Sequence, residues 1–358
     1  MSDTIFALSS GTPPAAIAVV RVSGPEAGNA LRALCGRIPA PRRAVTARLI
    51  DVEGEEIDRA LVLWLPGPGT TTGEDVAEFH LHGGRAVIAA LERTLAGLPG
   101  LRGATPGEFT RRAFANGRID LAEAEGLADL LTAETELQRR GAMAMAGGAF
   151  SRMVGTWRER LLTASARLEA VLDFGDEDDV APLPPSFAAD LAALHAEIAG
   201  WMARPRAEML REGYRVVIGG PPNLGKSTLF NMLVEADAAI TTPIAGTTRD
   251  VLTRPVSLGG IPFLFADTAG LHDSAGDEVE AIGIERALDA LDRADLVLWL
   301  GPEGTGPAGC WEIASQIDRA DAPRKRHARH RISARTGAGM DALRQDLIET
   351  ARKAMPKP

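Results

Sequence analysis

Apolar residues along this chain recur in two spacings, and the spacing changes with position. Short runs rich in β-branched and apolar residues, which are typical of strands, cover residues 16–22 and 60–65. The stretch 83–96 instead has apolar residues every three to four positions and ends before Gly97, which indicates a helix with a stop signal. Residues 1–117 therefore predict a small α+β domain.

The composition shifts from residue 119 to about residue 211, where Ala, Leu, Glu and Arg dominate and leucines recur at helical spacing. Helices are predicted over 150–171 and 186–210, with an acidic run at 173–179 between them. That run is either a site for a metal or a basic partner, or a solvated loop, which is the usual role of a charge run. Residues 118–211 thus predict a helical domain.

Strand and helix patterns alternate from about residue 214 to residue 354, with strand candidates at 215–219, 261–266 and 296–300. This alternation is typical of a parallel sheet with helices on both faces. We therefore expect a multidomain protein of the α/β and α+β classes, with an α/β domain at 212–358.

Composition narrows the function classes. The chain of 358 residues has two distant cysteines, Cys35 and Cys310, no apolar run of membrane-span length and no signal-peptide pattern, so we expect a cytoplasmic protein without a membrane partner. Its net charge of −9 disfavours binding nucleic acid through bulk electrostatics. Any such partner requires a local patch. The basic segment 324–331 is one candidate, and a solvated loop is the alternative.

The clearest motif lies between the strand candidate 215–219 and a helical run. It reads Gly220-Pro221-Pro222-Asn223-Leu224-Gly225-Lys226-Ser227, which has the G-x-x-x-x-G-K-[ST] spacing of a P-loop. In such a loop the backbone N–H groups and the helix N-terminus hold phosphates, Lys226 reaches the β and γ phosphates, and Ser227 binds Mg²⁺. The alternative is a glycine-rich turn that happens to contain a lysine.

Three further stretches follow in the order expected of a nucleotide hydrolase, and together they favour GTP over ATP. The stretch 244–250 contains Thr247 and Thr248, and a threonine there would complete the Mg²⁺ shell. In Asp267-Thr268-Ala269-Gly270, Asp267 would reach Mg²⁺ through water and the Gly270 N–H would bind the γ-phosphate. Ser333-Ala334-Arg335 matches a loop that supports the guanine O6.

The residue after Gly270 is Leu271, and an apolar side chain cannot polarise the attacking water. We expect Glu280 to replace a water-positioning glutamine. On spacing alone, an ordinary solvated acid at a helix start is an equally good interpretation of Glu280.

Several long motifs together resemble one family, the tRNA-modification GTPases called MnmE or TrmE, from the N-terminus to the end of the chain. The motifs that carry the resemblance are Thr12-Pro13-Pro14, Arg21-Val22-Ser23-Gly24, Thr72-Gly73-Glu74-Asp75, His82-Gly83-Gly84, the stretches 104–109 and 120–125, the P-loop, and the stretches 245–252 and 277–287.

The resemblance implies a K⁺ ion beside the phosphates, bound by Asn223, Thr242, Ile244 and Thr247, and a catalytic role for Glu280 together with Lys226 and Asn223. It implies a Mg²⁺ site with Ser227 and Thr248 as ligands and with Asp267 reaching the ion through water. The GTP site would comprise Asn223, Leu224, Gly225, Lys226, Ser227, Thr228, Thr242, Thr247, Thr248, Asp267, Thr268, Ala269, Gly270, Asp318, Ser333, Ala334 and Arg335.

The resemblance also implies a folate site and protein partners. The N-terminal domain would form a constitutive homodimer and bind a 5-formyl-tetrahydrofolate-type cofactor through Arg21, Glu78 and Arg118, the last of which stands where the family usually has Lys. GTP-bound G domains would dimerise across their switches. A flavin- and NADH-dependent partner, MnmG (GidA), would join in a heterotetramer that adds an aminomethyl or carboxymethylaminomethyl group to C5 of the tRNA wobble uridine.

This chain departs from the family pattern in three places. The guanine-reading Asn-Lys-x-Asp is replaced by Ser315-Gln316-Ile317-Asp318, so we expect GTP to be preferred but held more weakly. Pro221 replaces a frequent Arg, with little expected consequence. The chain ends at Pro358, without the family's further helices and Cys-x-Gly-Lys tail, as a truncated or divergent form would, so the helices of 119–210 are expected to expose apolar faces.

The sequence therefore predicts a K⁺-stimulated GTPase of wobble-uridine modification. The alternative is a GTP-switched, dimerising binding protein that has lost the tRNA chemistry. A ribosome-assembly GTPase is disfavoured, because the folate-domain motifs have no role in one.

Overall fold

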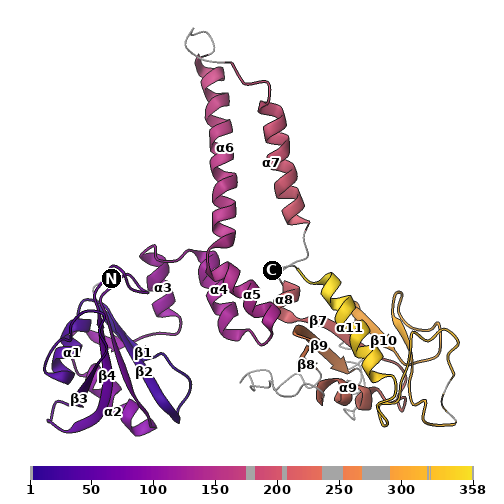
Figure 1. The fold of residues 1–358 in the computed structure, drawn as a ribbon, viewed down its shortest axis with the longest axis horizontal. Coiled ribbons are helices and arrows are strands. Elements are labelled where there is room, and N and C mark those ends of the chain that lie inside the picture. The colour runs from indigo at the N-terminus through magenta and orange to yellow at the C-terminus, as the bar shows by residue number, and fades with distance from the viewer. Residues whose placement is uncertain are drawn as a thin grey trace, which may run out of the picture. The chain divides into compact units, whose positions relative to one another are not determined.

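The computed structural model divides the chain into two compact units, Met1–Ala124 and Glu125–Pro358, each described here by itself. The residues described are 3–174, 182–203, 208–235, 253–267, 291–320, 322 and 324–356. Both units mix helices with a sheet, which confirms the predicted α/β and α+β multidomain class (Figure 1).

The first unit is built on a six-stranded sheet with the order β3-β4-β5-β2-β1-β6. Neighbouring strands are antiparallel, except for the parallel pair of β1 and β6. The strands are β1 (Thr4–Leu8), β2 (Ala15–Ser23), β3 (Val45–Ile50), β4 (Glu56–Leu65), β5 (Val76–Gly83) and β6 (Leu101–Gly103). The strands predicted at 16–22 and 60–65 are thus confirmed within β2 and β4.

Helices α1 (Ala27–Cys35) and α2 (Arg85–Ala96) share one apolar core with this sheet. Alternate residues of β2, including Val20 and Val22, point into that core, so the residues between them occupy the other face. The helix predicted to begin at Gly83 begins later, because Gly83 pairs with Ala15 as the last residue of β5. Helix α3 (Glu108–Ala115) follows β6.

The helical region contains α4 (Leu121–Thr132), α5 (Glu136–Ala146), α6 (Ala149–Phe174), α7 (Phe187–Met202) and α8 (Glu208–Glu212). Helix α5 begins with a capping box, in which the Thr135 side chain and the Gln138 side chain each bond the other's backbone N–H. Asp120 and Glu123 make the same reciprocal pair of side-chain to backbone bonds at the start of α4, and this pair caps the N-terminus of that helix.

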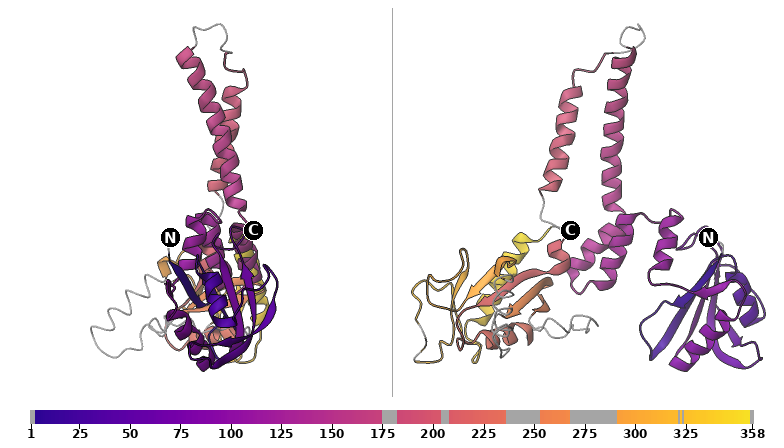
Figure 2. Two further views of the ribbon diagram at one scale, coloured as in Figure 1. Left: turned by 90° about the vertical axis from the view of Figure 1, so that its left-hand side faces the viewer. Right: turned by 180° about the vertical axis from the view of Figure 1, so that it is seen from behind.

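Helices α6 and α7 run side by side in every view (Figures 1 and 2), and Trp157 on α6 donates its indole N–H to Glu197 on α7 at 2.8 Å. The single helix predicted over 186–210 is wrong in extent, since α7 ends at Met202 and α8 is a separate element. Most of the acidic run 173–179 lies outside the described residues.

The second unit contains a six-stranded sheet with the order β12-β11-β10-β7-β9-β8. All neighbours are parallel except β8 and β9, so the parallel sheet predicted here carries one antiparallel edge strand that was not predicted. Gly259 and Gly260, both with positive φ (56° and 76°), connect these two strands as the tight turn of a hairpin. The strands are β7 (Tyr214–Gly219), β8 (Thr253–Leu258), β9 (Ile261–Asp267), β10 (Leu296–Trp299), β11 (Trp311–Ala314) and β12 (His330–Arg331).

Helices α9 (Lys226–Glu235) and α11 (Met340–Ala354) pack into one core with this sheet. Leu229 and Leu233 of α9, and Leu343 and Leu347 of α11, are buried at spacings of four residues, as one face of a helix requires. Among the residues described, no helix is both long and apolar enough to cross a bilayer.

Candidate nucleotide-binding site

The P-loop motif forms the turn between β7 and α9, which is the strand–turn–helix context that its spacing predicted. Gly220 has a φ of +141°, and an added Cβ would lie only 2.8 Å from the Gly301 N, so this position needs a glycine. Lys226 is 5% exposed, and its Nζ donates to the Pro221 carbonyl at 2.9 Å. The Lys226 side chain, at the start of α9, is therefore held against the backbone of the P-loop.

The stretch Ser315-Gln316-Ile317-Asp318 begins where β11 ends, and it lies against the P-loop. The Ser315 hydroxyl donates to the Leu224 carbonyl at 2.8 Å, and the Gln316 Nε2 donates to the Asn223 carbonyl at 3.1 Å. Both bonds join segments more than ninety residues apart. The two residues that replace the expected Asn and Lys therefore still contact the P-loop backbone.

Asp318 lies next to the third predicted loop. The Ser333 hydroxyl, which is fully buried, donates to the Asp318 carboxylate at 2.7 Å. This bond, together with the positive charges of Arg335 and Arg319, lowers the pKa of Asp318 below its ordinary value. The carboxylate is thus anionic at neutral pH and can accept hydrogen bonds from a nucleobase.

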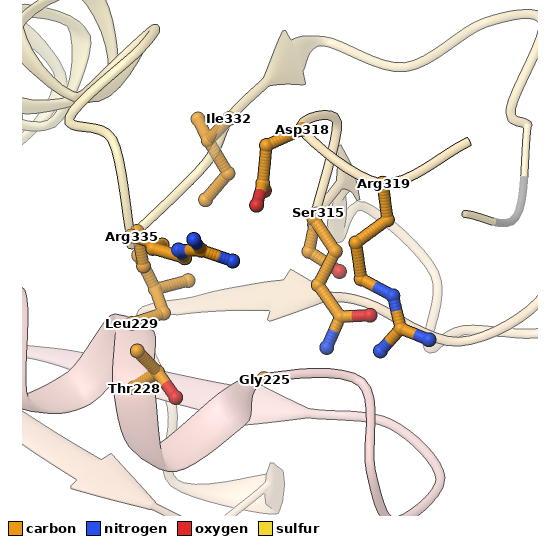
Figure 3. Close-up of a pocket in the computed structure, with 10 residues that line it drawn as sticks. Gly225, Thr228, Leu229, Ser315, Asp318, Arg319, Ile332 and Arg335 are labelled. Atoms are coloured by element: carbon orange, nitrogen blue, oxygen red, sulfur yellow. The ribbon is translucent and has the colours of Figure 1, made fainter. Parts of the chain in front are cut away.

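A cavity of about 400 Å³ opens between these segments (Figure 3). Asp318 and Arg335 point into it, with Thr228 and Gly225 on the P-loop side. The residues that line it are Gly225, Thr228, Leu229, Ser315, Gln316, Asp318, Arg319, Ile332, Ala334 and Arg335. Leu229, Arg319 and Ile332 were not predicted as site residues. A charged residue directly after Asp318 was the available signal for Arg319.

Two of the residues predicted to hold magnesium lie at the end of β9 and at the start of α9. Asp267 is the last residue of β9 and pairs in register with Ile218 of β7, the strand that leads into the P-loop. Ser227 stands in the first turn of α9, directly after that loop. Parallel strands place their carboxyl ends at one edge of a sheet, so Asp267 and the P-loop share that edge.

The remaining predicted residues of the nucleotide and cation sites lie outside the described residues. They are Thr242, Ile244, Thr247, Thr248, Thr268, Ala269, Gly270 and Glu280.

In the first unit, the predicted folate residues Arg21 and Glu78 are direct cross-strand partners on β2 and β5. The Arg21 guanidinium donates to Glu78 at 3.0 Å, and His80 contacts the same carboxylate at 3.2 Å. Burial by itself would raise the pKa of Glu78, but the hydrogen bonds from His80 and Arg21 outweigh it and lower that pKa. The group is an anion on the sheet face opposite α1 and α2.

Arg118, the third predicted folate residue, lies at the loop that precedes β5. Its Nε donates to the Thr70 carbonyl at 3.1 Å. The same loop meets β2, because Ser23 bonds both Thr72 and Glu74 at 2.7 Å. The structure thus connects Arg118 and the strand of Arg21 to one short loop.

The basic segment 324–331 is paired with carboxylates of the second unit at three of its residues, Lys325, Arg329 and His330. Lys325 is 4% exposed and pairs with Glu312 at 2.5 Å, so this one residue is not solvated, whereas Arg324 and Arg326 beside it are exposed, as the solvated-loop alternative predicts. Asp346 pairs with both Arg329 and His330, at 2.8 and 2.9 Å. These contacts weaken the phosphate-patch hypothesis for Lys325 and Arg329, because paired cations are less available to a polyanion.

Comparison with known proteins supports both units. The model for "GTP-binding protein TrmE N-terminus" matches residues 4–118, and the model for "MnmE helical domain" matches residues 121–357.

Similar proteins match over nearly the whole chain. A tRNA modification GTPase MnmE from Novosphingobium aromaticivorans is 63% identical over 370 aligned positions, which cover 100% of this chain and 85% of that relative. One from Erythrobacter litoralis is 62% identical over 356 positions, covering 99% and 84%. Among solved structures, the FeoB G domain from Methanococcus jannaschii aligns with a TM-score of 0.27 at 16% identity, covering 39% of this chain and 97% of that domain.

Proposed function

Because this chain belongs to the MnmE family of tRNA modification GTPases, we propose that it is a K⁺-stimulated GTPase that drives C5 modification of the wobble uridine in tRNA. The chain is a P-loop GTP hydrolase. The observation that carries the proposal is the pair of hydrogen bonds from Ser315 and Gln316 to the P-loop, which join a base-sized cavity to the phosphate-binding turn.

Guanine recognition is assigned to Asp318. Its carboxylate accepts hydrogen bonds, whereas the guanine N1 and N2 atoms carry hydrogens. Adenine presents an acceptor at N1, so it would leave the carboxylate unpaired. GTP is therefore preferred over ATP, although the absence of a lysine stem over the base makes GTP binding weaker than in relatives with Asn-Lys-x-Asp.

The described part of the chain fits a magnesium ion at the phosphate end. Ser227 and Asp267 offer hard oxygen donors, which Mg²⁺ prefers, and they lie at one edge of the sheet. Thr248 is assigned as the third residue of that site. When bound, Mg²⁺ offsets the negative charge of the β and γ phosphates.

A potassium ion also fits the P-loop. Asn223 is exposed, and within the described parts of the chain its amide side chain has no hydrogen-bond partner, so its oxygen is available to a cation. We assign Asn223, Thr242, Ile244 and Thr247 to this ion and Glu280 to orienting the attacking water. A cation there stabilises the charge that develops in phosphoryl transfer.

The folate site is assigned to Arg21, Glu78 and Arg118. An anionic, half-buried Glu78 suits the N–H-rich edge of a pterin ring, and the guanidinium of Arg118 suits a carboxylate of the folate tail. A 5-formyl-tetrahydrofolate-type cofactor bound there supplies the one-carbon unit.

The proposed assembly is a homodimer that joins the flavoprotein MnmG (GidA) in a heterotetramer acting on tRNA in the cytoplasm. Both cysteines, Cys35 and Cys310, are free thiols, which suits a reducing compartment.

The decisive experiment compares GTP turnover in K⁺ and in Na⁺, with Asn223→Gly as the test variant. Asn223 has a φ of +65°, so glycine removes the amide without backbone strain, whereas alanine would add strain. We expect K⁺ to stimulate the wild type about tenfold or more and the variant hardly at all. Equal wild-type rates in the two salts would overturn the proposal.

The tRNA role needs its own test. A strain that lacks its own gene of this family is complemented with this chain, and its wobble uridines are analysed. Restored C5 modification supports the proposal. K⁺-dependent GTP turnover without modification would favour the GTP-switched binding protein instead.

A further inference from the structure

One side chain of the second unit touches both halves of the proposed site. Gln316 lines the cavity assigned to the base, and its Nε2 donates to the Asn223 carbonyl at 3.1 Å. Asn223 is the residue assigned to the potassium ion. A continuous chain of contacts therefore runs from the base cavity through Gln316 to the cation end of the P-loop.

The two residues joined by this bond both have left-handed backbones, with φ of +65° at Asn223 and +57° at Gln316. Such a conformation is uncommon for residues other than glycine, and it persists when surrounding contacts hold it. At Asn223 the peptide carbonyl is held by Gln316, and at the next residue Leu224 it is held by the Ser315 hydroxyl at 2.8 Å.

The P-loop also leaves room for this amide. Gly225 has a φ of +84°, and an added Cβ would lie 3.3 Å from the Gln316 Nε2, closer than most such contacts. The glycine that the P-loop needs for phosphate therefore also admits the Gln316 side chain.

We propose that Gln316 is a positioning residue that couples base binding to the cation site. It holds the backbone carbonyl of Asn223, and this fixes the orientation in which the Asn223 side-chain amide faces the potassium ion. This inference rests on the proposed K⁺-stimulated GTPase. A base that enters the cavity orders the Gln316 side chain, and that order is passed to Asn223 through the hydrogen bond.

The test uses the full chain and two substitutions. Gln316→Met keeps a side chain of similar length in the cavity but removes the donor, whereas Gln316→Lys retains a donor. Ile317→Thr, at a neighbouring side chain that is 44% exposed, is the control. Initial rates of GTP hydrolysis are measured against GTP concentration at fixed K⁺ and against K⁺ concentration at saturating GTP. Each rate is divided by the concentration of active sites, which is determined by GDP binding.

For Gln316→Met we expect about a fivefold lower kcat, the scale of one uncharged hydrogen bond, and a severalfold higher K⁺ concentration for half-maximal rate. Gln316→Lys restores both values, and Ile317→Thr behaves as wild type. A base contact alone would raise KM and leave kcat unchanged.

Failure of the proposed coupling and failure of the proposed K⁺ mechanism give different results. If Gln316→Met raises only KM for GTP, the coupling is wrong while the proposed GTPase stands. If the wild type shows no K⁺ preference, the proposed K⁺ mechanism fails. In that case a lower kcat in Gln316→Met that lysine restores still supports the positioning role, and an unchanged kcat overturns it.

Discussion

The Ser333 hydroxyl donates a hydrogen bond to Oδ1 of Asp318 at 2.7 Å, across a separation of 15 residues in the chain. Ser333 itself is fully buried, and its oxygen accepts the backbone N–H of Thr336 at 3.2 Å. Asp318 therefore presents its carboxylate to the cavity from a fixed position. The guanine recognition proposed for Asp318 is therefore sensitive to a residue that does not itself line the cavity.

Replacing Ser333 by alanine is expected to weaken GTP binding about tenfold, or about 1.4 kcal/mol, because a hydrogen bond to a charged group is lost. ATP affinity should not change, since adenine offers Asp318 no N1 hydrogen. Both affinities are measured by titration with the full chain. An equal loss for the two nucleotides would indicate a collapsed cavity instead of a mispositioned carboxylate.

Asp318→Asn is expected to exchange guanine for xanthine specificity. Xanthine carries an oxygen at position 2 where guanine carries an amino group, so a side chain with both an acceptor and a donor matches it. We expect GTP affinity to fall at least about tenfold and XTP affinity to rise, as measured by competition for one fluorescent nucleotide. Loss of GTP binding with no gain for XTP would contradict the assigned role.

Arg112 in the first unit is expected to be the most costly charged residue to remove. It is 1% exposed and pairs with Glu108 at 3.2 Å and with Glu74 at 3.1 Å. Arg112→Met would remove the guanidinium from Glu74 and leave Glu108 paired with Arg102, and it should destabilise the unit by about 3–5 kcal/mol. Chemical unfolding followed by hydrogen exchange in residues 3–124 measures this. The double variant Arg112→Met, Glu108→Gln should recover part of the lost free energy of unfolding. If the effects of the two substitutions are strictly additive, Arg112 and Glu108 are not directly coupled.

The same cluster predicts a pH dependence. The hydrogen bond from Arg102 to Glu108 at 2.6 Å, reinforced by Thr105 and Arg112, holds the pKa of Glu108 far below its ordinary value. A carboxyl whose pKa is depressed on folding stabilises the fold fully above its ordinary pKa, and that contribution is lost as the pH falls towards the folded value. Glu108→Gln should therefore differ from wild type most at pH 7 and progressively less below about pH 4.5. A constant difference down to pH 3 in unfolding experiments would refute this.

Arg329→Ala is expected to affect stability and not tRNA binding. Its guanidinium lies 3.9 Å from the centre of the Trp311 ring and pairs with Asp346. Losing about 1 kcal/mol of such contacts corresponds to a drop in Tm of roughly 2–4 °C. Arg324→Ala, an exposed residue of the same segment, is the control and should change neither Tm nor tRNA affinity. Weaker tRNA binding by Arg329→Ala at an unchanged Tm would revive the phosphate-patch hypothesis.

The spacing of apolar residues predicted helices and strands correctly where the contacts that form them are close in the sequence. The apolar spacing predicted the bounds of β2, β9, α2 and α6 to within a few residues, because the face that a helix or strand buries is set by the periodicity of apolar residues within that segment. It failed at β8, where two consecutive glycines turn the chain back into an antiparallel edge strand. The Gly259-Gly260 pair was the overlooked signal.

The sequence by itself determined the P-loop turn between β7 and α9, because that turn is built from contiguous residues. Only the tertiary structure decided how the cavity proposed for the base is built. Whether Ser315 and Gln316 could replace the expected Asn and Lys depends on P-loop carbonyls more than ninety residues away. Whether the basic segment was free depended on Glu312 and Asp346, brought to it by folding. Distances between remote segments are set by the packing of the whole sheet, which no local pattern contains.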